Sequence, residues 1–378
     1  MRIEQRVWTA GGGWEQPPQQ SLNGNSDLVL AFASRQTLGA AQAYEQLRDE
    51  YPNAHVIGCS TAGEIHGINV KDEALSATAI DFQKTHLRTA RAEISGRGGS
   101  FAAGEELAAS LKADDLAHVL VLSDGLNVNG TELTRGLTQS LPDNVAVTGG
   151  LSADGDRFQQ TMVMLDGKPN SNMVAAIGFY GRDLKVGFGS IGGWEPFGPE
   201  RLVTRSRGNV LYELDGSSAL ELYEKYLGEY AAGLPASALL FPLAIRTDDP
   251  TRGLVRTILG IDRDARTMTF AGDIPEGSYA RLMKASSDRL VQGAGLAADS
   301  CLADMDAPPQ LALLISCVGR RLVLKQRVEE EIEAVAEVFG RATALAGFYS
   351  YGEIAPFALG ERPELHNQTM TITGFSEN

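Results

Sequence analysis

Short apolar runs alternate with amphipathic segments in three separate parts of the chain. In each part an apolar run of strand length precedes a segment with helical spacing of its apolar residues, and a second apolar run follows. The pattern predicts a strand, a helix and a strand that recur three times, which indicates internal duplication. The predicted units are 28–32, 36–50 and 55–57; 117–122, 131–140 and 145–147; and 311–317, 322–339 and 344–346.

A turn of small residues follows the second strand of every unit. The turns are 58–65, 149–155 and 347–354, and each carries polar side chains between its glycines. The first turn ends in Ser-Thr-Ala-Gly-Glu-Ile and the third in Ser-Tyr-Gly-Glu-Ile, so these two look alike. Because the units repeat, we expect the three turns to be equivalent and to lie around one pocket.

Alternating strand patterns fill the segments between the units. Residues 74–82 and 86–94 are predicted to form one hairpin, and residues 253–271 another. The expected fold class is therefore α/β (mixed α+β), with duplicated strand–helix–strand units, antiparallel hairpins and two associated halves. The predicted divisions are an irregular lead-in at 1–26, a domain at 27–215 and a domain at 216–378.

Charge and composition narrow the range of partners. The chain of 378 residues has 33 Lys and Arg against 48 Asp and Glu, a formal net charge of −15. Nucleic acids and anionic membranes need a basic face, so neither is expected as a partner. No apolar segment approaches the length of a signal sequence or a membrane span, and three cysteines are an odd number, which favours reduced thiols in the cytoplasm.

The familiar catalytic and metal-binding motifs are absent. The sequence contains no paired-cysteine or paired-histidine metal spacing, no P-loop and no Gly-x-Ser-x-Gly segment. No catalytic residue is therefore predicted, and the chain is not expected to be an enzyme.

Five motifs together resemble the two FIST domains. Segments 56–65 and 149–155 resemble the FIST N-terminal domain, and segments 211–216, 270–277 and 347–354 resemble the FIST C-terminal domain. The resemblance implies a bacterial sensor that binds a small molecule and acts through a separate partner signalling protein, such as a histidine kinase or a cyclic-diguanylate enzyme. One subgroup, the NosP-type proteins, binds haem and senses nitric oxide, which implies haem b as a candidate cofactor.

The turns supply the candidate ligand-binding residues. Small residues after a strand leave backbone N–H groups open to an anion, and hydroxyl and carboxyl groups beside them add specificity. The alternative is a set of tight connections in which glycine is needed for its positive φ. The candidates are Cys59, Ser60, Thr61, Gly63, Glu64, Gly149, Gly150, Ser152, Asp154, Ser350, Tyr351, Gly352, Glu353 and Asn367.

His366 is the candidate ligand for haem iron. It precedes the last predicted strand, and a neutral imidazole is a common metal ligand. The alternative is a structural histidine held by hydrogen bonds. Trp194 and Phe197, in a segment rich in turn formers, are candidates for a partner-binding surface, with packing in the seam between the two halves as the alternative.

Two other functions stay open beside the sensor. A hydrolase or a transferase can use Cys59 or Ser60 as its nucleophile, because a catalytic triad assembles in space rather than at a fixed spacing. A protein-interaction scaffold without a ligand is the other function, since a eukaryotic member of the FIST family carries an F-box.

Overall fold

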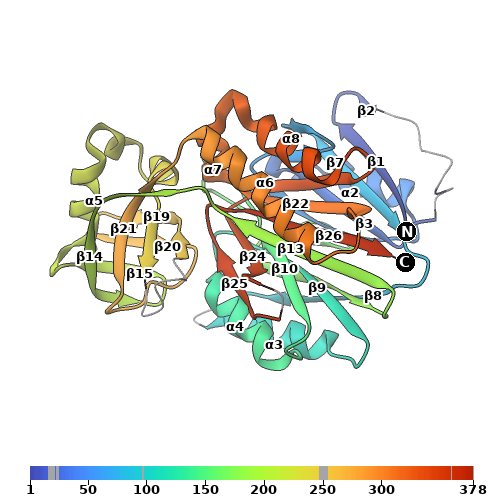
Figure 1. Ribbon diagram of the computed structural model, residues 1–378, viewed down its shortest axis with the longest axis horizontal. Helices are drawn as coiled ribbons and strands as arrows, with labels where there is room; N and C mark the ends of the chain where they lie inside the picture. Colours follow the sequence, from blue (N-terminus) through green and yellow to red (C-terminus); the bar gives the residue numbers. More distant parts are fainter. Residues whose placement is uncertain (16–21, 23–24, 96–97, 247–253, 359, 378) are drawn as a thin grey trace.

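The computed structural model describes residues 1–15, 22, 25–95, 98–246, 254–358 and 360–377. They form a large body of three six-stranded sheets and a small body built on one eight-stranded sheet (Figure 1). Both ends of the described chain lie in the large body, where the amino group of Met1 is 3.5 Å from the Glu377 carboxylate. The mixed α/β class expected from the sequence is confirmed.

Each sheet of the large body contains the parallel strand pair of one predicted unit. Sheet I has the order β11 (Val163–Leu165), β4 (His55–Thr61), β3 (Leu28–Ser34), β7 (Leu75–Asp81), β1 (Arg2–Thr9) and β2 (Gly13–Trp14). Sheet II has the order β25 (Pro363–His366), β24 (Gly352–Pro356), β10 (Ala146–Leu151), β9 (Leu116–Ser123), β12 (Met173–Tyr180) and β8 (His86–Glu93). Sheet III has the order β13 (Leu184–Ile191), β26 (Met370–Glu377), β22 (Leu311–Cys317), β23 (Ala344–Ser350), β5 (Glu64–His66) and β6 (Asn69–Lys71).

The strand after each turn leaves its own sheet and joins the next one. After β4 the chain enters β5, which pairs with β23 of sheet III. After β23 it enters β24, which pairs with β10 of sheet II, and after β10 it enters β11, which pairs with β4 of sheet I. The exchange is cyclic, so the three units predicted from the sequence are arranged as a repeat in space.

One glycine marks the same register position in every parallel pair. Gly58 lies opposite Ala31, Gly149 opposite Val121 and Gly347 opposite Leu314. A Cβ atom on any of these glycines would lie 1.8–1.9 Å from the carbonyl oxygen of the opposite residue. Only glycine allows the two backbones to approach this closely.

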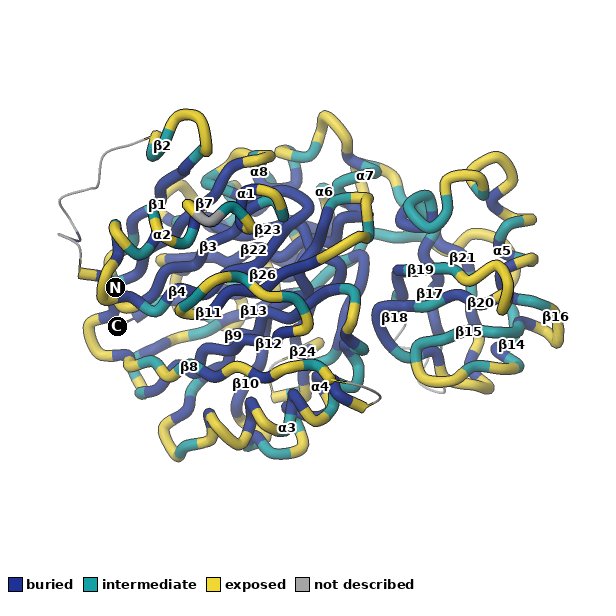
Figure 2. Tube along the Cα trace, turned by 180° about the vertical axis from the view of Figure 1, so that it is seen from behind, coloured by how far each residue is buried: buried dark blue, intermediate teal, exposed yellow. Residues whose placement is uncertain are grey.

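Helices join the two strands of each parallel pair and cover the sheets. The connecting helices are α1 (Arg35–Gly39) and α2 (Ala41–Glu50), α4 (Gly130–Ser140), and α7 (Val318–Leu324) and α8 (Val328–Phe339). Two further helices, α3 (Gly99–Leu111) and α6 (Ser287–Ala303), pack against α4 and α8 respectively. The central core draws side chains from all three sheets, among them Phe32, Phe179 and Phe348, and the inner strands in Figure 2 are accordingly buried.

The small body is inserted between β13 and α6. Its sheet has the order β18 (Leu254–Arg256), β17 (Leu243–Arg246), β21 (Tyr279–Lys284), β14 (Glu195–Arg207), β15 (Val210–Leu214), β20 (Thr267–Phe270) and β19 (Ile258–Asp262), and β16 (Ser217–Ser218) pairs with β15. Helix α5 (Ala219–Leu227) packs its apolar side against this sheet. The domain boundary placed near residue 215 falls inside the small body, between β15 and β16, so it remains a proposed division of the sequence.

One predicted hairpin is confirmed and the other is wrong. Strands β19 and β20 pair as expected for residues 253–271, although 253 itself lies outside the described residues. Strands β7 and β8 do not pair, because β7 belongs to sheet I and β8 to sheet II. The carboxylate of Glu377 accepts hydrogen bonds from the backbone N–H groups of residues 83, 84 and 85, at 2.6, 2.8 and 2.7 Å. These bonds fix the segment between β7 and β8 as a crossover from sheet I to sheet II.

The long helix predicted for 322–339 is interrupted. Helix α7 ends at Leu324, and Lys325 adopts a φ of 54°, which is incompatible with a continuous right-handed helix. Helices α3 and α6 were not anticipated by the sequence pattern. Among the described residues, no helix is long and apolar enough to cross a membrane.

Candidate functional site

The three predicted turns meet, as the repeat implied. Backbone hydrogen bonds join the first turn to the second, from Ala153 N to Ser60 O at 2.8 Å, and to the third, from Ala62 N to Tyr349 O at 2.9 Å. The second and third turns are joined by strands β10 and β24. The turns therefore form one junction at the centre of the large body.

This junction is closed rather than hollow. The side chains of Ser60, Glu64, Ser152, Ser350 and Glu353 are all 0% exposed. The candidate glycines at 63, 150 and 352 pack against neighbouring side chains, and a Cβ atom on any of them would lie within 3 Å of another atom. In this conformation the turns hold the three sheets together, and their part in ligand binding remains a prediction.

Two equivalent carboxyl groups are buried in the junction. Thr61 Oγ1 lies 2.5 Å from Glu64 Oε1, and Ser350 Oγ lies 2.5 Å from Glu353 Oε1. Burial raises the pKa of Glu64 and of Glu353 to about 8, although their hydroxyl partners act in the opposite direction. Both groups are therefore mostly protonated at neutral pH, and each takes part in hydrogen bonds as a neutral acid.

In the second turn the carboxyl group is bound by arginines instead of a hydroxyl group. The Asp154 carboxylate accepts hydrogen bonds from Arg35 at 3.1 Å and from Arg157 at 2.7 Å. Two guanidinium groups satisfy this buried carboxylate, so Asp154 is occupied within the protein.

The two candidate nucleophiles are also closed off. Burial, reinforced by the nearby Glu64, raises the pKa of the Cys59 thiol well above its usual range. Ser60 Oγ donates to Ala153 O at 2.8 Å and accepts from Met162 N at 3.0 Å, so it supports the turn. A thiolate or an activated hydroxyl needs access to its substrate, and neither side chain has it.

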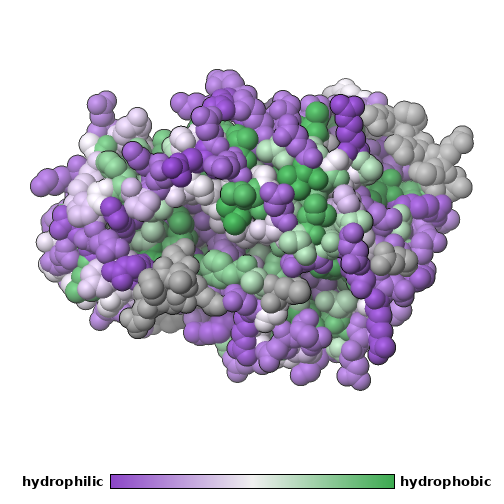
Figure 3. All heavy atoms as spheres, in the orientation of Figure 1, coloured by the Kyte–Doolittle hydropathy of each residue, from purple (hydrophilic) through white to green (hydrophobic). Residues whose placement is uncertain are grey.

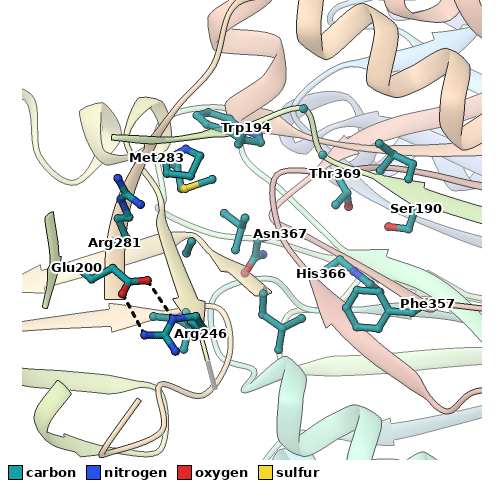
Figure 4. A pocket seen from close by; sticks show the side chains of 18 residues that line it. Ser190, Trp194, Glu200, Arg246, Arg281, Met283, Phe357, His366, Asn367 and Thr369 are labelled. Carbon is teal, nitrogen blue, oxygen red and sulfur yellow. Dashed lines mark hydrogen bonds and ion pairs between the residues drawn. The ribbon is translucent and has the colours of Figure 1, made fainter. Parts of the chain in front are cut away.

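A cavity of about 550 Å³ lies between the two bodies (Figure 4). The small body supplies one wall from β14, β17, β18 and β21, and the large body supplies the other from β13 and from the segments around β25. The lining residues are Ser190, Ile191, Gly192, Gly193, Trp194, Pro196, Glu200, Ala244, Ile245, Arg246, Leu254, Val255, Arg281, Met283, Phe357, His366, Asn367 and Thr369.

The alternation of β21 explains the small-body wall. Ala280 and Leu282 face the core of the small body, so Arg281 and Met283 on the same strand face the cavity. Arg281 Nε donates to the carbonyl of Gly198 at 2.7 Å, which fixes the plane of its guanidinium group.

A second arginine on this wall is already paired. Arg246 binds Glu200 through two parallel hydrogen bonds, both of 3.0 Å. Figure 4 shows this pair and Arg281 on the same side of the cavity.

His366 and Trp194 belong to the opposite wall. His366 Nε2 lies 2.8 Å from Ala355 O, and burial lowers the pKa of His366 to about 4, so the ring is neutral near pH 7. The ring of Phe357 meets the His366 ring edge to face, with centroids 4.5 Å apart. Trp194 Nε1 donates to Gln368 O at 2.9 Å, which places Trp194 in the seam between the bodies, as the second sequence interpretation expected. Phe197 does not follow that interpretation, because it is 44% exposed.

Three hydroxyl groups connect this cavity to the third turn. Ser190 Oγ lies 2.7 Å from Thr371 Oγ1, which is 3.2 Å from Thr369 Oγ1. Thr369 Oγ1 then donates to Glu353 Oε2 at 2.9 Å. Of the residues predicted from the sequence, Asn367 and His366 line the cavity, and Glu353 lies one hydrogen bond behind its wall.

The sequence pattern missed Glu200, Arg246, Arg281 and Phe357. The arginines stand among the apolar residues of two short strands, Leu-Ala-Ile-Arg at 243–246 and Tyr-Ala-Arg-Leu-Met-Lys at 279–284, and such a pattern also describes a partly solvated strand. In Figure 3 hydrophilic residues cover most of the small body on this face, so a charged side chain on one of its strands is not distinctive.

In this conformation His366 is poorly placed to hold haem iron. In the neutral ring Nε2 donates to the Ala355 carbonyl, so the lone pair that binds a metal lies on Nδ1. The side chain is only 4% exposed, so haem iron has little access to that nitrogen. Among the described residues, no group of three or more His, Cys, Asp or Glu side chains is arranged to hold a metal ion.

Comparisons with known proteins agree with the motifs. The FIST N domain model matches residues 27–217 and the FIST C domain model matches residues 219–356. An uncharacterized protein of Methanocaldococcus jannaschii is 26% identical over 331 residues, which are 77% of this chain and 60% of that protein. An uncharacterized protein of Mycobacterium tuberculosis is 26% identical over 250 residues, 63% of each chain.

The chain thus spans about 60% of the length of the curated relatives that it matches. Among solved structures, a cyanuric acid hydrolase from A. caulinodans aligns over 100% of this chain and 99% of its own, with a TM-score of 0.39 and 8% identity. The two domain models match in order and together cover most of the residues, so the chain belongs to the FIST family.

Proposed function

We propose that this chain is the small-ligand-binding module of a signal-transduction system, and that its ligand binds in the cavity between the two bodies. FIST domains are associated with sensing in signal transduction. The observation that carries the proposal is that this cavity of about 550 Å³ has walls from both bodies and a more apolar lining than a second hollow between the bodies, near Asn129 and Asn209. A ligand there contacts both walls, so it has a different affinity for each relative arrangement of the bodies.

A buried network of hydrogen bonds and an ion pair connects the cavity wall to helix α8. Arg320 donates to the carbonyl of Gly192 on the cavity wall, and to Glu331 of α8 at 2.8 and 3.0 Å. Both members of this ion pair are fully buried, so a shift of the wall is transmitted to α8. Exposed glutamates on α8, such as Glu333 and Glu337, make it a candidate contact for the partner protein.

The receiver in this proposal is a separate protein, such as a histidine kinase or a cyclic-diguanylate enzyme. The charge of −15 supports a protein partner over a nucleic acid or an anionic membrane. A haem-based nitric-oxide sensor is not favoured, because His366 is only 4% exposed and would first have to be uncovered for iron to reach it.

A cavity-filling variant tests the location. Ala244 lines the cavity on β17, and Ala265 is exposed in the β19–β20 turn of the same small body. We expect native mass spectrometry of the purified protein to detect a bound small molecule, which Ala244→Trp loses and Ala265→Trp retains. An absorption spectrum of the same sample reports haem directly. A molecule retained by Ala244→Trp at full occupancy, with its thermal stabilisation unchanged, would place the ligand elsewhere.

A further inference from the structure

We infer that the seam cavity selects a small organic monoanion, with its carboxylate on Arg281 and an apolar or aromatic body against Trp194, Met283 and Phe357. The inference rests on the proposed location of the ligand and adds its chemical class. Arg281 is oriented by the hydrogen bond from its Nε to Gly198 O, which holds the guanidinium plane in place. Within the described chain its two terminal nitrogens have no hydrogen-bond or ion-pair partner, so they offer a fork that matches a carboxylate.

The net charge of the lining residues fits a ligand with one negative charge. Two arginines and one glutamate line the cavity, and the charge of Arg246 is neutralised by its two hydrogen bonds to Glu200. The remaining titratable group, His366, is held neutral by burial. Among the lining residues that the structure describes, one uncompensated guanidinium therefore remains, and these residues offer a doubly charged phosphate too few donors.

The lining offers little to a ligand ammonium group. Both Glu200 oxygens are bonded to Arg246, and Asn367 Oδ1 accepts from the backbone N–H of Thr257 at 3.2 Å. An ammonium group placed against Arg281 would add repulsion and lose its hydration. A zwitterion is therefore expected to bind more weakly than the matching simple acid.

The rest of the cavity favours an apolar body. Trp194 is fixed by its bond to Gln368, so its ring presents a fixed surface to the cavity. Met283 adds a flexible, polarizable side chain close to Trp194, and Phe357, with 39% of its surface exposed, lies at the other end. A volume of about 550 Å³ accommodates a ring with a short acid side chain.

Three matched probes test the inference by isothermal titration calorimetry. 3-Phenylpropanoate carries the carboxylate alone, 3-phenylpropanamide replaces it with a neutral amide, and L-phenylalanine adds an ammonium group. We expect 3-phenylpropanoate to bind and the other two to bind about tenfold more weakly or worse, the usual effect of losing a charged hydrogen bond or adding an unpaired charge. Arg281→Gln should lose about tenfold for 3-phenylpropanoate, and Arg281→Lys should recover part of that loss.

Arg289→Gln is the control, because Arg289 is 56% exposed, pairs with Glu195 and lies outside the lining. Equal binding of the three probes, no binding by any of them at millimolar concentration, or an Arg281→Gln variant that binds normally would each overturn the inference. A neutral or cationic molecule that co-purifies and is displaced by Ala244→Trp would overturn it too, while leaving the proposed location intact. Thermal unfolding of each variant confirms that the comparison is between folded proteins.

Discussion

Glu64 and Glu353 were predicted to face a ligand, and in the structure both are buried. Each follows a hydroxyl residue by three positions in a turn, and the pattern predicted a polar group open to a ligand. The likeness of the two turns was correctly identified, because it is a local property. Their burial was not, because it depends on strands from three sheets that no local pattern relates.

The raised pKa of Glu353 predicts a pH-dependent stability. Its pKa is about 8 in the folded protein and 4.5 in the reference state, so between these values the folded state binds more protons. The stabilisation is complete below pH 4.5 and is lost as the pH rises towards 8. Glu353→Gln keeps a neutral group of the same shape, so its free energy of unfolding should fall less steeply between pH 5 and 8.

Urea denaturation at several pH values checks this prediction. The difference between Glu353→Gln and the natural protein should move in favour of the variant by more than about 1 kcal/mol over that range. The exposed Glu337→Gln should show no such change. Parallel pH profiles for Glu353→Gln and the natural protein would contradict a protonated buried acid.

At the scale of elements, the repeated strand–helix–strand units were predictable because period and length are encoded locally. The cyclic exchange of strands between sheets was not, since it arises from pairing between residues such as Glu64 and Phe348, which are far apart in the chain. The wrong hairpin has the same cause. The carboxylate that holds the crossover after β7 comes from Glu377, at the opposite end of the sequence.

The close approach within each parallel pair makes a prediction for Gly347. Its φ is 157°, and a Cβ atom would lie 1.8 Å from Leu314 O. Gly347→Ala must therefore separate β22 from β23 or strain the backbone, and we expect a loss of about 3 kcal/mol or more in the free energy of unfolding. Gly260→Ala is the control, since its Cβ atom would meet open space. Equal denaturation midpoints for the two variants would show that the repeated glycines are not required by strand approach.

At the scale of the whole molecule, the sequence identified the FIST family and two associated halves but not the seam cavity. The cavity depends on the insertion of the small body, which brings Arg246 and Arg281 opposite His366. Strand patterns show which side of a strand is polar. They do not show whether that side meets water or a second body, and so the ligand wall could not be separated from ordinary surface.

Arg256 is predicted to hold the two bodies as one cooperative unit. It lies on β18 of the small body, is 3% exposed, and donates through Nη1 to Leu365 O of the large body at 2.9 Å. Burial lowers the pKa of Arg256 to about 10, so the group is still charged at neutral pH. Arg256→Met removes the donor and leaves a buried carbonyl unpaired, at a cost of about 1–3 kcal/mol.

Because that cost falls on the contact between the bodies, we expect calorimetry to resolve two unfolding transitions for Arg256→Met and one for the natural protein. Binding in the seam cavity should weaken in the same variant, since its two walls are no longer held at a fixed separation. Arg263→Met, which changes an arginine 60% exposed on the same body, should preserve both the single transition and the affinity. A single transition at an unchanged midpoint in Arg256→Met would mean that other contacts of the seam, such as the bond from Asn129 to Asp273, are sufficient to couple the bodies.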